Sequence, residues 1–316
     1  MKDLPVIFLM GPTAAGKTGL AVDLAQRLPV EIVSVDSAMV YRGMDIGTAK
    51  PSPEILRIAP HHLVDICDPS EVYSAARFRD DAMHCIERIH ARGRMPLLVG
   101  GTGLYFRALD QGLSVLPSGD AGMRKRLEAE AENIGWSAMH ARLAEFDPEA
   151  AGKIHPNDPQ RIQRALEVYM LTGRPITTHF REVLKQRLPW RVVKIIITPS
   201  DRGRLHQQAE ERFLRMLDNG LVAEVRRLQA RGDLHARLPA MRLVGDRQVW
   251  DHLEGRLSYE AMVVKAITAT RQLIKRQLTW LRKEQDGHAF DSQEDGVRDK
   301  ILIFLEDRLK SGQFVI

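Results

Sequence analysis

Short apolar runs along the chain are separated by longer stretches in which apolar residues recur at helical spacing. Short unbroken apolar runs are typical of parallel strands whose two faces are both covered. Runs of this kind occupy residues 6–10, 31–36, 95–99 and 194–198, with a possible short strand at 61–65. Between them, residues 17–28, 74–91 and 159–172 repeat apolar side chains every three or four positions, which predicts amphipathic helices. The alternation predicts an α/β fold with a parallel sheet.

Two regions depart from this alternation. The segment 117–190 contains no strand-like run, and residues 201–281 are mostly helical in pattern, with a long basic helix at 261–283. We therefore expect a P-loop core made of residues 1–116 and 191–316, whose C-terminal part is helical and basic, and a helical insertion at 117–190. The last thirty residues are acidic and carry no motif that we can interpret.

The first apolar run leads directly into a glycine-rich turn. Residues 11–18 fit the pattern G-x-x-x-x-G-K-[ST] and are followed by an amphipathic helix, which is the context that a phosphate-binding loop requires. Backbone N–H groups of such a turn bind a diphosphate, the lysine adds a positive charge, and the final hydroxyl is suited to Mg²⁺. The candidate phosphate-binding residues are Gly11, Pro12, Thr13, Ala14, Ala15, Gly16, Lys17 and Thr18, with Thr18 as the metal ligand.

Two further strand ends carry candidate chemistry. Asp36 ends the second run, and the carboxyl ends of parallel strands face the ligand crevice of an open sheet. Asp36 or Ser37 is equally suited to cap a helix. After the run at 95–99, the chain has Gly100, Gly101 and Thr102, where P-loop ATPases commonly have an acid that helps to hold Mg²⁺. This difference favours a small-molecule transferase over a motor or switch NTPase.

Composition and charge narrow the class of protein. Charged residues make up 28% and hydrophobic residues 44% of the chain, which is ordinary for a globular protein, and we expect no membrane span and no signal peptide. The cysteines, Cys67 and Cys85, have no metal or redox spacing, which favours reduced thiols in the cytoplasm. Residues 191–285 carry 19 basic and 11 acidic groups, an excess of +8 against +5 overall. This excess is compatible with an acidic partner such as nucleic acid and equally with a solvated helical surface.

Taken together, the motifs resemble the bacterial tRNA dimethylallyltransferase (tRNA isopentenyltransferase) family. The matching stretches are 11–18, 34–37, 41–51, 98–105, 155–161 and 245–248. The resemblance implies transfer of a dimethylallyl group from dimethylallyl diphosphate to the exocyclic amine of the adenine immediately 3′ of the anticodon. It also implies Mg²⁺ as cofactor, the tRNA anticodon arm as partner, and a monomer.

The resemblance further implies roles for individual residues. Asp36 is then the general base, Thr102 lies beside the target nucleotide, and Arg212 neutralises the leaving group, while Thr18 holds the metal. The implied tRNA contacts are Asp36, Ser37, Ala38, Met39, Thr102, Arg124, Gln160, Arg161, Ile162, Gln163, Arg164, Arg242, Leu243, Val244, Gly245, Asp246 and Arg247.

One position departs from the family pattern. Family members usually have tyrosine where this chain has Asp246. If this carboxylate faces RNA, it repels phosphates, and Asp246→Tyr is expected to tighten tRNA binding.

Three other functions are compatible with parts of the sequence. They are a P-loop small-molecule kinase, a non-catalytic RNA-binding module, and prenyl transfer to free adenine nucleotides.

Overall fold

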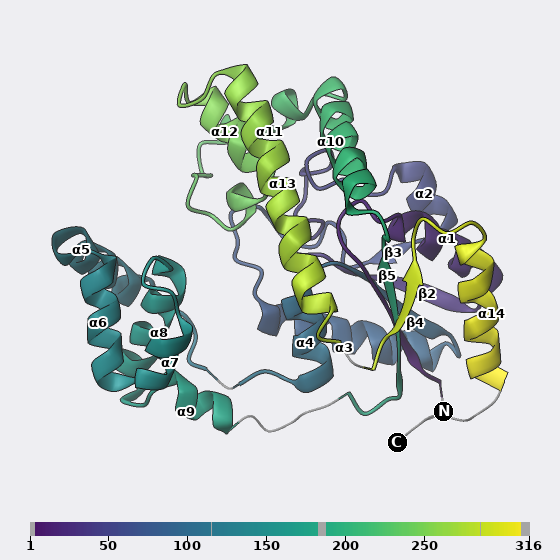
Figure 1. Ribbon diagram of the computed structural model, residues 1–316, viewed down its shortest axis with the longest axis horizontal. Coiled ribbons are helices and arrows are strands. Elements are labelled where there is room, and N and C mark those ends of the chain that lie inside the picture. The colour runs from purple at the N-terminus through teal and green to yellow at the C-terminus, as the bar shows by residue number, and fades with distance from the viewer. Residues whose placement is uncertain (1–3, 115, 183–187, 285, 311–316) are drawn as a thin grey trace. The chain divides into compact units, whose positions relative to one another are not determined.

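The computed structural model describes residues 4–114, 116–182, 188–284 and 286–310. The chain forms two compact units, one made of residues 1–109 with 188–316 and the other of residues 110–187. The expected boundaries lay slightly later, at 117 and 190. Figure 1 traces the elements in chain order from purple to yellow.

The first unit is built on a six-stranded parallel sheet in the order β3-β2-β4-β1-β5-β6. The strands are β1 (Val6–Met10), β2 (Val30–Val35), β3 (His61–His62), β4 (Met95–Gly100), β5 (Val192–Thr198) and β6 (His288–Asp291). β1 is central, and its Leu9 lies in register with Val99 of β4 and Ile195 of β5. The predicted α/β class with a parallel sheet is confirmed.

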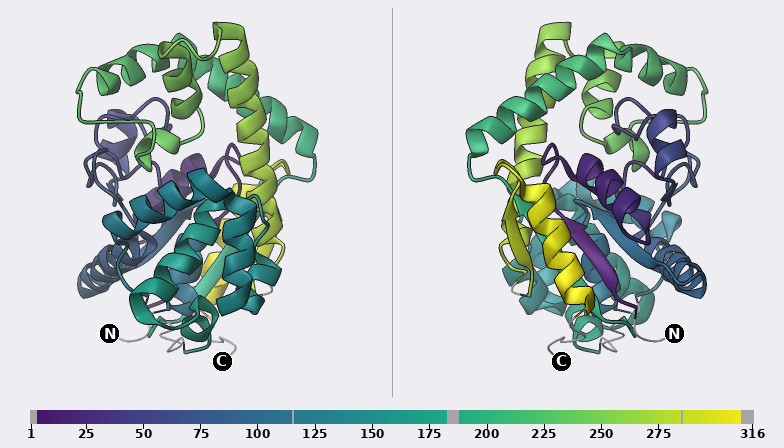
Figure 2. Two further views of the ribbon diagram at one scale, coloured as in Figure 1. Left: turned by 90° about the vertical axis from the view of Figure 1, so that its left-hand side faces the viewer. Right: turned by 90° about the vertical axis from the view of Figure 1, so that its right-hand side faces the viewer.

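One face of the sheet packs against the N-terminal and C-terminal helices. Ile7 and Leu9 of β1 lie in one buried cluster with Leu24 of α1 (Lys17–Arg27) and with Ile301 and Leu305 of α14 (Val297–Lys310). Figure 2 shows α14 running along this side of the sheet. The strand β6 and the helix α14 both lie in the acidic C-terminal region, for which we had no interpretable motif.

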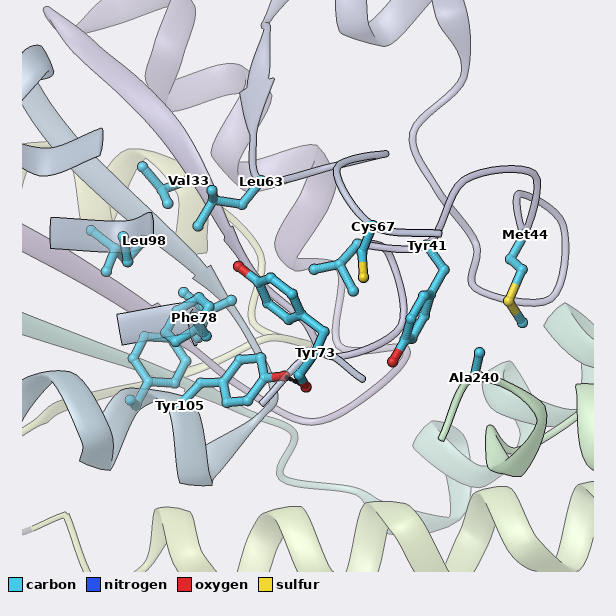
Figure 3. Close-up of a cluster of buried hydrophobic side chains, with 14 of the residues drawn as sticks. Val33, Tyr41, Met44, Leu63, Cys67, Tyr73, Phe78, Leu98, Tyr105 and Ala240 are labelled. Carbon is cyan, nitrogen blue, oxygen red and sulfur yellow. Dashed lines mark hydrogen bonds between the residues drawn. The ribbon is translucent and has the colours of Figure 1, made fainter. Parts of the chain in front are cut away.

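The opposite face packs against most of the remaining helices of the first unit. Its buried cluster contains Phe8 of β1, Val33 of β2 and the aromatic side chains Phe78 and Tyr105, whose rings stack 4.2 Å apart (Figure 3). The helices of the first unit besides α1 and α14 are α2 (Pro53–Ile58), α3 (Ala75–Ala91), α4 (Gly103–Gln111), α10 (Arg202–Asp218), α11 (Leu221–Gln229), the 3₁₀ helix η1 (Ala240–Arg242), α12 (Asp246–Leu253) and α13 (Tyr259–Leu281). The expected long basic helix is α13.

The second unit contains helices joined by loops, and no strand, in the part that the structure describes. Its helices are α5 (Ala121–Ile134), α6 (Trp136–Phe146), α7 (Pro148–Lys153), α8 (Pro159–Thr172) and α9 (Ile176–Arg181). The limits of α8 follow from its end residues: the side chain of Asp158 accepts a hydrogen bond from the backbone N–H of Arg161, and Gly173 ends the helix with φ of 69°. A separate buried cluster, which includes Leu127, Leu143 and Leu166, holds these helices together.

Candidate active site

The phosphate-binding loop joins β1 to α1, as its sequence predicts. Lys17 is the first residue of α1, and its Nζ donates a hydrogen bond to the carbonyl of Pro12, 2.6 Å away. Gly16 has φ of 78°, a left-handed conformation that suits glycine. Burial lowers the pKa of Lys17 to about 8, the nearby Asp36 partly opposes this shift, and Arg212 adds to it. This lysine is half-buried, lines a cavity, and lies close enough to both side chains for their charges to affect it.

Two adjoining cavities meet at this loop. The first, which we call the phosphate cavity, has a volume of about 390 Å³ and is lined by Lys17, Thr18, Asp36, Gly100 and Arg212 among others. The second, which we call the side cavity, has a volume of about 570 Å³ and is lined by Thr102, Leu104, Arg242, Val244 and Trp280 among others. Thr13, Asp36 and Arg212 line both cavities. The structure thus brings these three residues to the boundary between a phosphate-binding loop and a second space.

Asp36 is held in one orientation by the turn that follows β2. Its Oδ1 accepts hydrogen bonds from the backbone N–H groups of Ala38 at 2.8 Å and Met39 at 3.4 Å. Residues 37–40 form a turn and no helix begins there, so the helix cap that we considered for Asp36 or Ser37 is wrong, and the carboxylate of Asp36 instead closes the turn. The N–H of Ser37 donates instead to Thr102 Oγ1 at 3.2 Å, which ties the end of β2 to the turn after β4. Oδ2 of Asp36 and the hydrogen of the Thr102 hydroxyl are then the groups left to meet a ligand.

Arg212 reaches this boundary from α10. Burial lowers the pKa of its guanidinium from the ordinary value, and Asp36 acts in the opposite direction. Arginine remains charged under such conditions because its ordinary pKa is above 12. Lys17, Arg212 and the loop N–H groups thus supply positive charge to the phosphate cavity.

The two glycines after Val99 have a packing role that the sequence did not reveal. We expected Gly100 and Gly101 to let a ligand approach closely. Both line the cavities, but a Cβ on Gly100 would overlap the backbone carbonyl of Val35, and one on Gly101 would overlap the amide of Gln277. The absence of side chains here is required by neighbouring protein atoms.

Gln277 is a site residue that our sequence reasoning missed. Its side chain is 8% exposed, and its Oε1 accepts a hydrogen bond from the N–H of Thr13 at 2.8 Å. Its Nε2 donates to the carbonyl of Gly101 at 3.1 Å, so one amide joins α13 to the phosphate-binding loop and to the end of β4. The available signal was its position, because Ile274, Gln277 and Leu281 follow the apolar spacing of a helix.

The segment at 242–247 is divided between exposed and buried side chains. Arg242 and Arg247 are exposed, and Arg242, Leu243 and Val244 line the side cavity. Asp246 is only 1% exposed. The expectation that its carboxylate faces RNA is therefore wrong, and Asp246→Tyr has no space for the larger side chain because the carboxyl already abuts Gly47.

Two of the six tRNA-contact residues predicted in the second unit pair with one buried acid, Glu167. Arg124 of α5 donates to Glu167 of α8 from Nε at 2.8 Å, and Arg164 donates to the same carboxylate at 2.5 Å. Gln163 donates to the carbonyl of Arg124 at 3.1 Å, while Gln160 and Arg161 are exposed on the same helix. Ile162 is fully buried, so its side chain is unavailable to a ligand.

The described residues contain neither a cluster of metal-binding side chains nor a helix that could cross a membrane. Within the described ranges, no three His, Cys, Asp or Glu side chains form a group suited to a metal ion. No helix in the same ranges has both the length and the apolar character needed to cross a membrane. The hydroxyl of Thr18 nevertheless provides an oxygen atom in the phosphate cavity. This donor set fits Mg²⁺, which commonly takes one or two protein oxygens and completes its shell with substrate phosphates and water.

Comparison with known proteins supplies the family. The chain is 57% identical over 304 residues to the tRNA dimethylallyltransferase of Alkalilimnicola ehrlichii, covering 95% of this chain and 96% of that protein. It is 59% identical over 278 residues to the corresponding enzyme of Thioalkalivibrio sulfidiphilus, covering 88% and 87% respectively.

Solved structures agree with these relatives. The full-length tRNA isopentenylpyrophosphate transferase of Bacillus halodurans aligns with a TM-score of 0.72 at 37% identity, covering 99% of this chain and 98% of that one. A eukaryotic dimethylallyltransferase acting on tRNA aligns with a TM-score of 0.81 at 27% identity, covering 99% and 81%. The model of the IPP transferase family matches residues 39–284. The phosphate-binding loop, Asp36 and Thr102 lie at one boundary, and the family model matches most of the chain. The chain therefore belongs to the IPP transferase family.

Proposed function

We propose that this protein transfers the dimethylallyl group of dimethylallyl diphosphate to the exocyclic amine of the adenine immediately 3′ of the anticodon in tRNA. The observation that carries the proposal is the boundary between the two cavities, where Asp36, Thr102 and Arg212 adjoin the phosphate-binding loop. Family membership and the names of the relatives support the same reaction.

The phosphate cavity suits the diphosphate. Backbone N–H groups of the loop, Lys17 and Arg212 are in place before the reaction, so they stabilise the charge that develops on the leaving diphosphate. Mg²⁺, which Thr18 would hold, neutralises part of the diphosphate charge when it is bound. The bond between the allylic carbon and the diphosphate oxygen breaks, and the electron pair leaves with the diphosphate.

The side cavity suits the adenine. The exocyclic nitrogen forms the new bond to the allylic carbon and loses one proton, which Oδ2 of Asp36 accepts. The Thr102 hydroxyl accepts from the N–H of Ser37 and retains its hydrogen, so it can donate to a ring nitrogen of the base. The base reaches this space only after leaving its stack in the anticodon loop.

Contact with the rest of the tRNA uses basic residues, which are exposed except for Arg164, a half-buried residue that pairs with Glu167. We assign Arg124, Arg161 and Arg164 of the second unit, with Arg242 and Arg247 of the first, to phosphates and bases of the anticodon arm. We further propose that the protein works as a cytoplasmic monomer. The free thiols of Cys67 and Cys85 fit a reducing compartment.

The test is the mass of tRNA after incubation with dimethylallyl diphosphate and Mg²⁺. The tRNA should gain one dimethylallyl group per molecule, and Asp36→Asn should lower turnover by about 10²–10⁴-fold. Asp218→Asn, an exposed change on the helix that carries Arg212, is the matched control and should keep wild-type turnover.

Parallel reactions with AMP and with ATP plus small-molecule acceptors test the alternatives. Prenylation of AMP but not of tRNA would show that the acceptor is a free adenine nucleotide and not tRNA. Phosphate transfer from ATP without prenylation would overturn the proposal, although the relatives do not favour a kinase.

A further inference from the structure

Asp246 is a buried acid without a hydrogen-bond partner. It begins α12, it is 1% exposed, and both of its carboxylate oxygens lack a partner within the described part of the chain. A buried carboxylate that is ionised and unpaired is strongly disfavoured, so such groups take up a proton. The mechanism described above makes no use of this residue.

A second buried acid lies nearby and has the opposite surroundings. Glu224 of α11 is also 1% exposed, but its carboxylate accepts hydrogen bonds from the backbone N–H groups of Asp45, Ile46 and Gly47, each at 2.9 Å. Burial first, and then the negative charge of Glu224, raise the pKa of Asp246 to about 7.

Both acids act on the same loop. A Cβ on Gly47 would lie 2.5 Å from Oδ1 of Asp246 and 2.7 Å from Oδ2, so the carboxyl is pressed against this residue. The charged residues of the loop, Asp45 and Lys50, pair with each other at 2.7 Å. Arg242 and Arg247, on the segment that carries Asp246, are exposed.

This loop forms part of the wall of both cavities. Gly47 and Thr48 line the side cavity together with residues 242–244, and Ala49 and Pro51 line the phosphate cavity. Figure 3 shows Met44 of the same loop beside Ala240 of η1, and both residues belong to one buried cluster. A change in the contact between Asp246 and Gly47 therefore acts on the space proposed for the adenine.

We propose that Asp246 is a positioning residue that holds the loop at 45–49 against residues 242–244 as an uncharged carboxyl, and that losing its proton moves this wall of the side cavity. Once Asp246 loses its proton, its negative charge lies beside the carboxyl group of Glu224, and no hydrogen-bond donor among the described residues compensates it. The inference rests on the proposed function, because it takes the side cavity as the adenine site. It makes binding of the acceptor base dependent on one proton held outside the reacting groups.

The kinetic test compares wild type with Asp246→Asn, which has nearly the same shape and stays neutral. We measure kcat/KM for tRNA at saturating dimethylallyl diphosphate from about pH 6 to about pH 9. Wild type should lose about tenfold per pH unit above pH 7, while Asp246→Asn should lose less than about threefold over the same range. Asp251→Asn, on the same helix, is the control and should follow wild type. Equal pH profiles for wild type and Asp246→Asn would overturn the inference.

Hydrogen exchange separates this inference from the proposed function. After correction for the intrinsic effect of pH, exchange of the backbone amides at 45–49 in wild type should rise by up to about tenfold per pH unit between about pH 5 and about pH 7 and level off above pH 7. Opening is coupled to loss of one proton only while the closed state still holds that proton. This measurement needs no activity and can be made on wild type if Asp246→Asn does not fold. Corrected exchange that does not change between about pH 5 and about pH 7 would refute the inference even if the enzyme prenylates tRNA. Changed exchange without tRNA prenylation would refute only the proposed function.

Discussion

Gln277 gives the sharpest test of how the active site is held together. Its amide makes two buried hydrogen bonds, to the N–H of Thr13 and to the carbonyl of Gly101. We choose Gln277→Met, because methionine has a similar volume and makes neither bond. Gln277→Ala adds a cavity to the same loss, and Gln272→Ala changes an exposed glutamine of the same helix as a control.

The magnitude follows from the two groups left unpaired. Each buried donor or acceptor without a partner costs about 1–3 kcal/mol. Gln277→Met should therefore lower the free energy of unfolding by about 4 kcal/mol. Gln277→Ala should lower it further because of the cavity, by a few tenths to about 2 kcal/mol. Gln272→Ala should stay within about 0.5 kcal/mol of wild type, as exposed substitutions usually do.

Urea unfolding measures these differences, and calorimetry with dimethylallyl diphosphate and Mg²⁺ measures the second consequence. Because Thr13 belongs to the phosphate-binding loop, losing its partner makes the loop donors less preorganised. We expect the Kd for the diphosphate to rise about tenfold in Gln277→Met, which corresponds to about 1.4 kcal/mol. A Gln277→Met protein with the stability and diphosphate affinity of wild type would refute this account of the amide.

Two further predictions concern charge. The pKa of Lys17 lies at about 8 because of burial, so its ammonium is charged below that pH and neutral above it. The affinity for dimethylallyl diphosphate, measured by calorimetry, should then fall about tenfold per pH unit above pH 8 in wild type but not in Lys17→Met. Burial alone would raise the pKa of Glu167, but hydrogen bonds from Arg124 and Arg164 outweigh burial and lower it. The ionised carboxylate therefore stabilises the fold at neutral pH. This stabilisation is lost as the pH falls below the ordinary pKa of a glutamate. Glu167→Gln should lower the free energy of unfolding by about 2 kcal/mol at pH 7. The difference from wild type should shrink toward pH 4. Thermal unfolding at both pH values measures it, and a difference that stayed constant would contradict this prediction.

The sequence was sufficient for features that depend on neighbouring residues. The order of strand, glycine-rich turn and helix at 6–28 requires only local spacing, and the structure has each part where the pattern predicts it. The placement of Asp36 and Thr102 at one edge also followed, since the carboxyl ends of parallel strands meet there.

Features that depend on distant residues were not accessible in the same way. Gln277 bonds to Thr13 across 264 positions, and the environment of Asp246 is set by Gly47 and Glu224, which are far from it in the sequence. An acid between two arginines looks exposed until the fold is known. The edge strand β6 has only four residues, too few for a periodic pattern to identify it.

The strand order has a consequence for how the chain is made. β1 at residues 6–10 needs β4 at 95–100 on one side and β5 at 192–198 on the other, and β5 in turn pairs with β6 at 288–291. The second unit, at 110–187, is a continuous stretch and can fold on emerging from the ribosome, before β5 has been synthesised. The strand leading to the phosphate-binding loop is thus translated long before β5 and gains its second neighbour only when β5 has been made. Until residue 198 emerges, the backbone groups along one edge of β1 remain unpaired. We therefore expect chaperones to bind the nascent chain during this interval.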